Sequence, residues 1–67
     1  MDTNALYSLF KIAIESEQNS QKHYEELIAI TGDEEAKKLL ESFLVQEKYH
    51  EEKLKELYLE LKEKLTE

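Results

Sequence analysis

The chain has 67 residues, of which 16 are acidic and 9 are basic, so its formal net charge is −7 at pH 7. It has no cysteine, no proline and one glycine, which excludes disulfides and thiolate-bound iron–sulfur or zinc sites and argues against a multi-stranded sheet. The negative charge disfavours nucleic acid and anionic membranes as partners. No apolar run approaches the length of a membrane span, and no N-terminal signal segment is evident, so the expected location is the cytoplasm.

Residues 3–30 are expected to form the first helix, with Asp2 or Thr3 as its N-terminal cap. Apolar positions recur in this segment at alternating three- and four-residue steps, which is the spacing of a seam in a helical bundle. The seam consists of Leu6, Phe10, Ala13, Glu17, Ser20, Tyr24 and Leu27. Glu17 is therefore an acid at a position that normally faces another helix.

The only strong break in the pattern lies at residues 30–33. Gly32 is expected to adopt the left-handed conformation that commonly closes a helix. Asp33 is expected to cap the next helix, where the acidic side chains of Glu34 and Glu35 favour the positive end of the helix dipole.

Residues 34–65 are expected to form the second helix. Its seam consists of Ala36, Leu40, Phe43, Glu47, His50, Leu54, Leu57 and Leu61. A lone hairpin would leave much of both seams in water, so the predicted fold class is all-α, an antiparallel helical hairpin that dimerises into a four-helix bundle. Residues 1–67 would form one domain. The second helix overhangs the first near Leu65, which favours assembly beyond a dimer, such as a ring.

The polar seam residues predict a metal site. Glu17 and Glu47 each lie 15 residues from Gly32, so a hairpin brings them to the same height, and His50 shares the face of Glu47. Two chains would gather four carboxylates and two imidazoles, and two divalent cations would offset the four negative charges. Iron, manganese and zinc all accept these ligands. The alternative is a solvated or paired cluster without a metal.

Other polar residues receive simpler interpretations. Tyr24 is two turns from Glu17 on the same face, so it is expected in the core with its hydroxyl available to a ligand carboxylate. Glu15 and His23 lie off the seam. Glu15 is expected at the surface, and His23 at the surface or in a contact between dimers. Glu51 follows Glu47 by one turn, where it would flank the site, lie on the surface or line an entry path to the site.

Two segments resemble half-length members of the ferritin-like superfamily, namely rubrerythrin-type domains and encapsulated ferritins. They are residues 13–27, with Ala-Ile-Glu-Ser-Glu and His-Tyr-Glu-Glu-Leu, and residues 43–50, Phe-Leu-Val-Gln-Glu-Lys-Tyr-His. Separations of 30 and 33 residues from Glu17 to Glu47 and His50 look most similar to encapsulated ferritins. The resemblance implies that these three residues are iron ligands, that Tyr24 hydrogen-bonds near them, and that two iron ions bridge two chains.

The resemblance also implies a function. It would be a ferroxidase that oxidises Fe(II) to Fe(III) with dioxygen, for iron storage or detoxification inside an encapsulin-type compartment. Two alternatives stay open. One is a rubrerythrin-like peroxide reductase, which would need an external electron donor because the chain has no cysteines for a rubredoxin module. The other is a non-catalytic helical dimerisation module.

Overall fold

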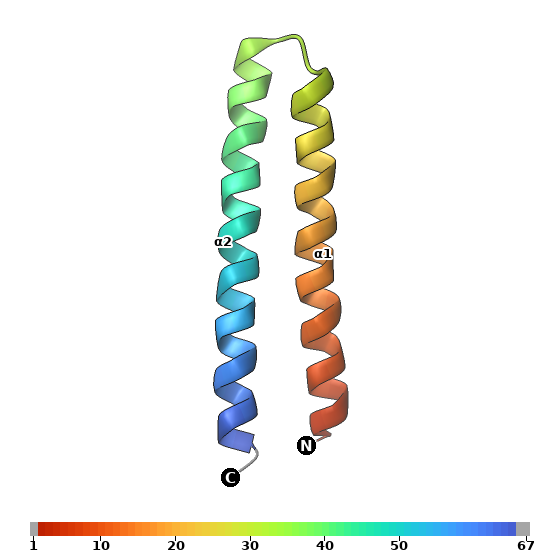
Figure 1. The fold of residues 1–67 in the computed structure, drawn as a ribbon, viewed down its shortest axis with the longest axis vertical. Coiled ribbons are helices and arrows are strands. Elements are labelled where there is room, and N and C mark those ends of the chain that lie inside the picture. The colour runs from red at the N-terminus through yellow and green to blue at the C-terminus, as the bar shows by residue number, and fades with distance from the viewer. Residues whose placement is uncertain (1, 66–67) are drawn as a thin grey trace.

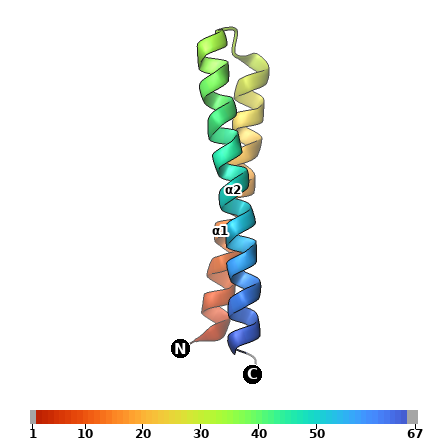
Figure 2. The same ribbon diagram turned by 90° about the vertical axis from the view of Figure 1, so that its left-hand side faces the viewer.

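The computed structural model describes residues 2–65 and shows a helical hairpin (Figure 1). Helix α1 spans Thr3–Ile30 and helix α2 spans Glu34–Leu65. The helices therefore begin and end where the sequence pattern predicted. They run antiparallel with both chain ends at the same end of the molecule, cross at a small angle in the second view (Figure 2), and extend over 52 Å. Positions 1, 66 and 67 of the predicted domain lie outside the described residues.

Local hydrogen bonds explain where the helices start. The Asp2 carboxylate accepts a hydrogen bond from the backbone N–H of Ala5 at 3.1 Å, so Asp2 rather than Thr3 is the cap of α1. The backbone carbonyl of Asp33 accepts the N–H of Lys37 at 2.9 Å, which places Asp33 at the start of α2. Acidic residues in the first turn of α2 and lysines in its last turn complement the helix dipole.

The backbone conformation that ends α1 differs from the prediction, although its last residue does not. Across residues 2–65 neither glycine nor any other residue has a positive φ, so the prediction of a left-handed Gly32 is wrong. Thr31 ends the helix instead, in an extended conformation with φ −76° and ψ 124°. Its N–H donates to the Leu27 carbonyl at 2.9 Å. Because Thr31 already turns the chain out of the helix and satisfies this carbonyl, Gly32 needs no left-handed conformation.

Aromatic side chains hold the two helices together at both ends of the hairpin. Tyr58 of α2 contacts Tyr7 and Phe10 of α1, with ring centroids 5.6 and 5.9 Å apart. Nearer the turn, Tyr24 packs against Phe43 at 5.8 Å. These are ordinary separations for interacting aromatic rings.

The hairpin covers only part of its apolar surface. None of the residues from 2 to 65 is fully buried. Leu27 and Leu57 belong to the predicted seams, yet their exposed fractions are 43% and 44%. The overhanging Leu65 is 39% exposed. A two-helix hairpin alone therefore leaves a large share of its seam leucines in contact with water.

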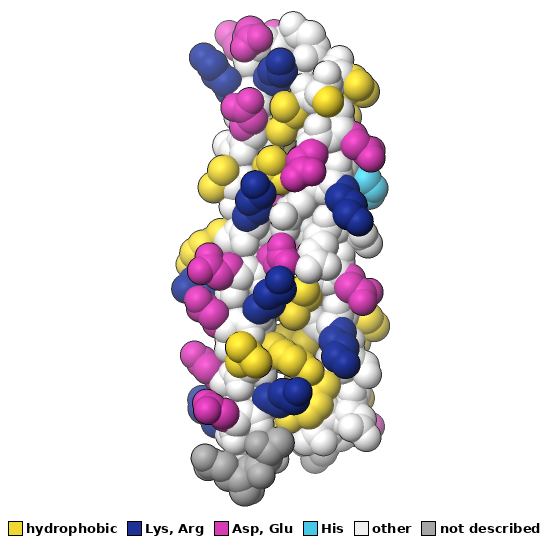
Figure 3. Space-filling view, in the orientation of Figure 1, with side chains coloured by type: hydrophobic (Ala, Val, Ile, Leu, Met, Phe, Trp, Pro, Cys, Tyr) yellow, Lys and Arg dark blue, Asp and Glu magenta, His cyan; other side chains and the backbone are white. Residues whose placement is uncertain are grey.

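One face of the hairpin carries charged side chains of both signs. On the face seen in Figure 3, acidic and basic side chains alternate along both helices, and apolar side chains gather towards the end that carries the termini. Over the described part of the chain, no helix has an apolar stretch long enough to cross a membrane.

The turn makes Gly32→Ala a test of the observed backbone. A Cβ at position 32 would meet no atom within 4 Å, and φ is not in the left-handed region. Alanine restricts the unfolded chain more than glycine does, so we expect a gain of about 0.4–1 kcal/mol in the free energy of unfolding. Urea unfolding followed by circular dichroism, at one fixed protein concentration, measures it. A clear loss of stability would indicate a left-handed Gly32.

Candidate metal centre

Glu17, Glu47 and His50 meet between the two helices. Glu17 comes from α1, while Glu47 and His50 lie one turn apart on α2. One potential ligand atom from each residue lies within 4.8 Å of the others. His50 Nδ1 lies 3.5 Å from Glu17 Oε2. Both carboxylates are half-buried and the His50 side chain is 53% exposed, so the cluster opens to one side of the hairpin.

One carboxylate oxygen in this cluster has no hydrogen-bond partner. Glu17 Oε2 is buried and accepts no hydrogen bond, because His50 Nδ1 at 3.5 Å is too distant for a good one. A buried carboxylate oxygen without a donor is unfavourable. Carboxylate and imidazole ligands bind a divalent cation at about 2.0–2.2 Å, so small side-chain rotations would close these three residues on one ion. The residues therefore fit a metal.

The electrostatics of Glu47 reflect the same crowding. Its pKa is raised above the ordinary value of 4.5, chiefly by a hydrogen bond with Glu17 and also by partial burial and the charge of Glu17. His50 acts in the opposite direction. Two carboxylates that face each other favour a shared proton, and a bound cation would remove this conflict.

The cluster borders an uncovered apolar surface. Glu17 and His50 line a hollow of about 320 Å³, together with Lys53, Leu54 and Leu57. A second hollow, of about 240 Å³, is lined by Leu6, Leu9, Phe10, Ala13 and Leu54. Leu54 lines both hollows, so the two adjoin at this residue. We call this surface the open face, and the candidate ligands lie on it.

The remaining predicted residues occupy simpler positions. Tyr24 packs against Phe43, and within residues 2–65 its hydroxyl forms no hydrogen bond to Glu17 or Glu47. Its role beside the ligands stays a prediction. Glu15 and His23 are exposed, as expected.

A second polar cluster, which the seam pattern did not predict, lies at the same height. Glu51 Oε1 accepts a hydrogen bond from Gln21 Nε2 at 2.7 Å, and Glu51 Oε2 accepts one from Gln18 Nε2 at 2.8 Å. Lys55 Nζ lies 2.7 Å from Glu51 Oε2. Hydrogen bonds from Lys55, Gln18 and Gln21 lower the pKa of Glu51 to about 2. The three-residue spacing of the glutamines beside the seam was the available signal.

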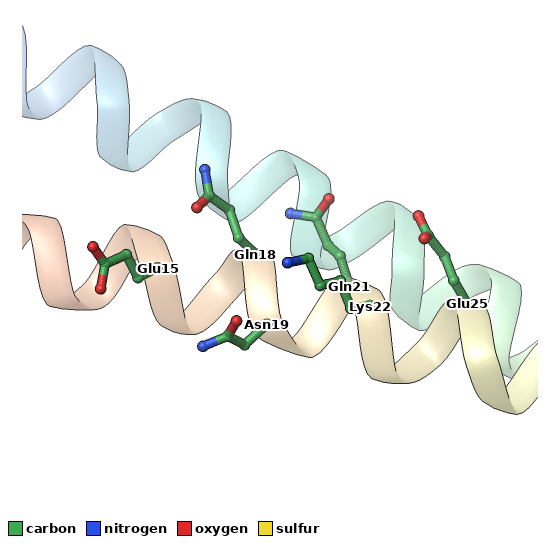
Figure 4. A pocket seen from close by; sticks show the side chains of 6 residues that line it. All are labelled: Glu15, Gln18, Asn19, Gln21, Lys22 and Glu25. Atoms are coloured by element: carbon green, nitrogen blue, oxygen red, sulfur yellow. The ribbon is translucent and has the colours of Figure 1, made fainter.

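Gln18 and Gln21 extend from α1 towards α2, whereas Glu15 and Asn19 point elsewhere (Figure 4). All four line a polar hollow of about 420 Å³ together with Lys22 and Glu25. This hollow shares no lining residue with the two on the open face. It is therefore separate from the hollow beside His50.

Comparison with known proteins identifies the class of the chain. The family model for rubrerythrin matches residues 1–58. The chain belongs to the rubrerythrin family, within the ferritin-like superfamily, which confirms the resemblance found in the sequence. Rubrerythrin-type domains bind iron, and the cluster described above is a candidate iron site. No curated protein and no solved structure matches the chain.

The raised pKa of Glu47 predicts how the metal-free protein responds to pH. A carboxyl group whose pKa is raised by folding stabilises the folded state below its unfolded pKa of about 4.5, and this stability is lost as the pH rises through the folded pKa. With a chelator present, the wild type should therefore lose free energy of unfolding relative to Glu47→Gln as the pH rises from about 4 to 7. Urea titrations of both proteins measure this difference, and a difference that grows in favour of the wild type would contradict it.

Proposed function

We propose that the chain is a di-iron ferroxidase, which oxidises Fe(II) to Fe(III) with dioxygen at a centre formed between two copies. The observation that carries this proposal is the position of the cluster. Glu17, Glu47 and His50 come together on the open face, beside apolar surface that the hairpin leaves uncovered. Membership of the rubrerythrin family supports iron as the metal.

The need for two copies follows from ligand number and charge. One hairpin offers two carboxylates and one imidazole, which is too few to enclose a pair of iron ions. A two-fold axis through the open face would double the set and balance two Fe(II) ions against four carboxylates. The same contact would cover the open-face residues Leu9 and Leu57, whose exposed fractions are 64% and 44%. Burial of such leucines is favourable by about 25 cal/mol per Å² of apolar surface.

The residues would have distinct tasks. Iron is the substrate in this proposal, and it supplies the electrons that dioxygen takes up. Glu17 and Glu47 would hold the ions through anionic oxygens, which stabilise the ferric product more than the ferrous substrate because its charge is higher. The imidazole of His50 would add a nitrogen ligand.

The destination of the ferric product is part of the proposal. A slender hairpin, or a pair of them, encloses no space for a mineral. We therefore propose that Fe(III) leaves the centre for storage or detoxification in an encapsulin-type compartment, as the 30- and 33-residue ligand separations favour. The exposed Leu65 at the overhanging end of α2 supports a higher, ring-like oligomer of dimers.

Anaerobic addition of Fe(II), followed by air, tests the activity. We expect about one iron per chain, because two ions would bridge two chains, and a near-ultraviolet ferric absorption that grows when oxygen enters. Glu47→Ala should abolish both signals and keep the helicity, since it removes half of the carboxylates from the centre. Glu15→Ala is the matched control, because Glu15 is exposed and outside the cluster. Unchanged iron oxidation by Glu47→Ala would rule out this site.

The same samples distinguish the ferroxidase from the alternative functions. The family match favours peroxide reduction as the second candidate, and faster oxidation of the bound iron by hydrogen peroxide than by dioxygen would replace the ferroxidase proposal with it. Metal binding without oxidation would leave a structural metal site. A Glu17→Leu variant that is more stable, with unchanged metal content, would show a dimerisation module.

A further inference from the structure

Glu51 joins the two helices with both of its carboxylate oxygens. Gln21 donates to one oxygen at 2.7 Å, and Gln18 donates to the other at 2.8 Å. Lys55, one turn further along α2, pairs with the same carboxylate at 2.7 Å. The Glu51 side chain is only 17% exposed, against 53% for Lys55. We call these four residues the Glu51 clasp.

The clasp and the candidate ligands occupy the same section of the hairpin. Gln18 directly follows Glu17 on α1, and Glu51 directly follows His50 on α2. Successive helical residues differ by about 100° around the axis, so Glu51 and His50 point to different sides of α2. The separate hollows at Gln18 and at His50 agree with this. Around α2, Glu47 therefore lies between His50 on one side and Glu51 of the clasp on the other.

The clasp restricts how the helices slide. Apolar contacts are non-directional and tolerate small shifts, whereas a hydrogen bond weakens steeply beyond about 3.2 Å. A slide of one residue moves α1 by about 1.5 Å along α2. Such a slide would strain both bonds to Glu51. It would also change the separation between Glu17 and the two α2 residues of the cluster.

We infer that Glu51 is a positioning residue for the metal centre, which acts through Gln18 and Gln21 to keep Glu17 level with Glu47 and His50. This inference rests on the proposed function. Glu51 is not itself a ligand, because amide and ammonium donors occupy both of its oxygens. In this inference, Glu51 fixes the register of the two helices, and Glu17 and Glu47 bind the metal.

Cobalt binding to the metal-free full chain tests this role, with Co²⁺ alone as the probe. Its visible absorption reports the number and geometry of the ligands, and a titration gives the affinity. Glu51→Ala should weaken the affinity about 10- to 100-fold, as loss of a group that orients a ligand does, and should change the absorption spectrum. The paired change Gln18→Ala with Gln21→Ala should have a similar effect. Combining all three changes should add little, because they remove the same contact.

Two further variants sharpen the measurement. Glu51→Gln keeps one oxygen that can accept from an amide, so it should recover most of the affinity. Glu56→Ala is the matched control, since it breaks an exposed pair with Lys53 at 3.1 Å on the same helix. It should leave the affinity within about twofold of the wild type. Circular dichroism confirms that each variant is helical during the titration.

The possible outcomes distinguish failure of this inference from failure of the proposed function. If Glu51→Ala is less stable but binds Co²⁺ with the affinity and spectrum of the wild type, the role is structural and the inference is overturned. If Glu51→Ala does not fold, the paired glutamine variant decides, because it keeps the Glu51–Lys55 ion pair. If the helical wild type binds no Co²⁺, the proposed function fails first, and this inference fails with it.

Discussion

The structure depends on three polar side chains that stand where a helical bundle normally places apolar ones. Glu17, Glu47 and His50 interrupt seams otherwise made largely of leucine, alanine and aromatic residues. A hydrogen bond with Glu17, partial burial and the charge of Glu17 raise the pKa of Glu47, and one oxygen of Glu17 has no hydrogen-bond donor. Both effects are unfavourable in the metal-free hairpin. A cation between these groups would remove both effects. Its positive charge would attract each carboxylate and replace the repulsion between them.

The same constraint links the metal to association. Residues 2–65 include none that is fully buried, so a single hairpin gains little from the hydrophobic effect. A second copy on the open face would bury leucines, but it would also bring four carboxylates together. In the proposed dimer, association and metal binding therefore favour each other. The apolar surface supplies the attraction between chains, and the cations remove the repulsion at its centre.

Much of this arrangement could be predicted from the sequence because it depends on local signals. Helix ends follow from caps and from the three- and four-residue apolar spacing, and counting outward from Gly32 brings Glu17 level with Glu47. The conformation of Gly32 was missed because either a left-handed glycine or an extended Thr31 can end α1, and spacing does not distinguish them. The contacts of Glu51 were missed because they depend on side-chain rotamers and on the rotation of each helix about its axis.

Two glutamates one turn apart on α2 show why the candidate ligands are those proposed. Glu51 faces amide and ammonium donors supplied by the chain, and these lower its pKa to about 2. Glu47 faces another carboxylate, and its pKa is raised instead. The chain thus satisfies one carboxylate fully and leaves the other with a neighbour of the same charge. A side chain that the fold already satisfies gains little from a cation, whereas Glu47 and the unpaired oxygen of Glu17 gain most. This difference between the surroundings of Glu47 and Glu51 is the physical reason to place the metal at Glu17, Glu47 and His50 rather than at Glu51.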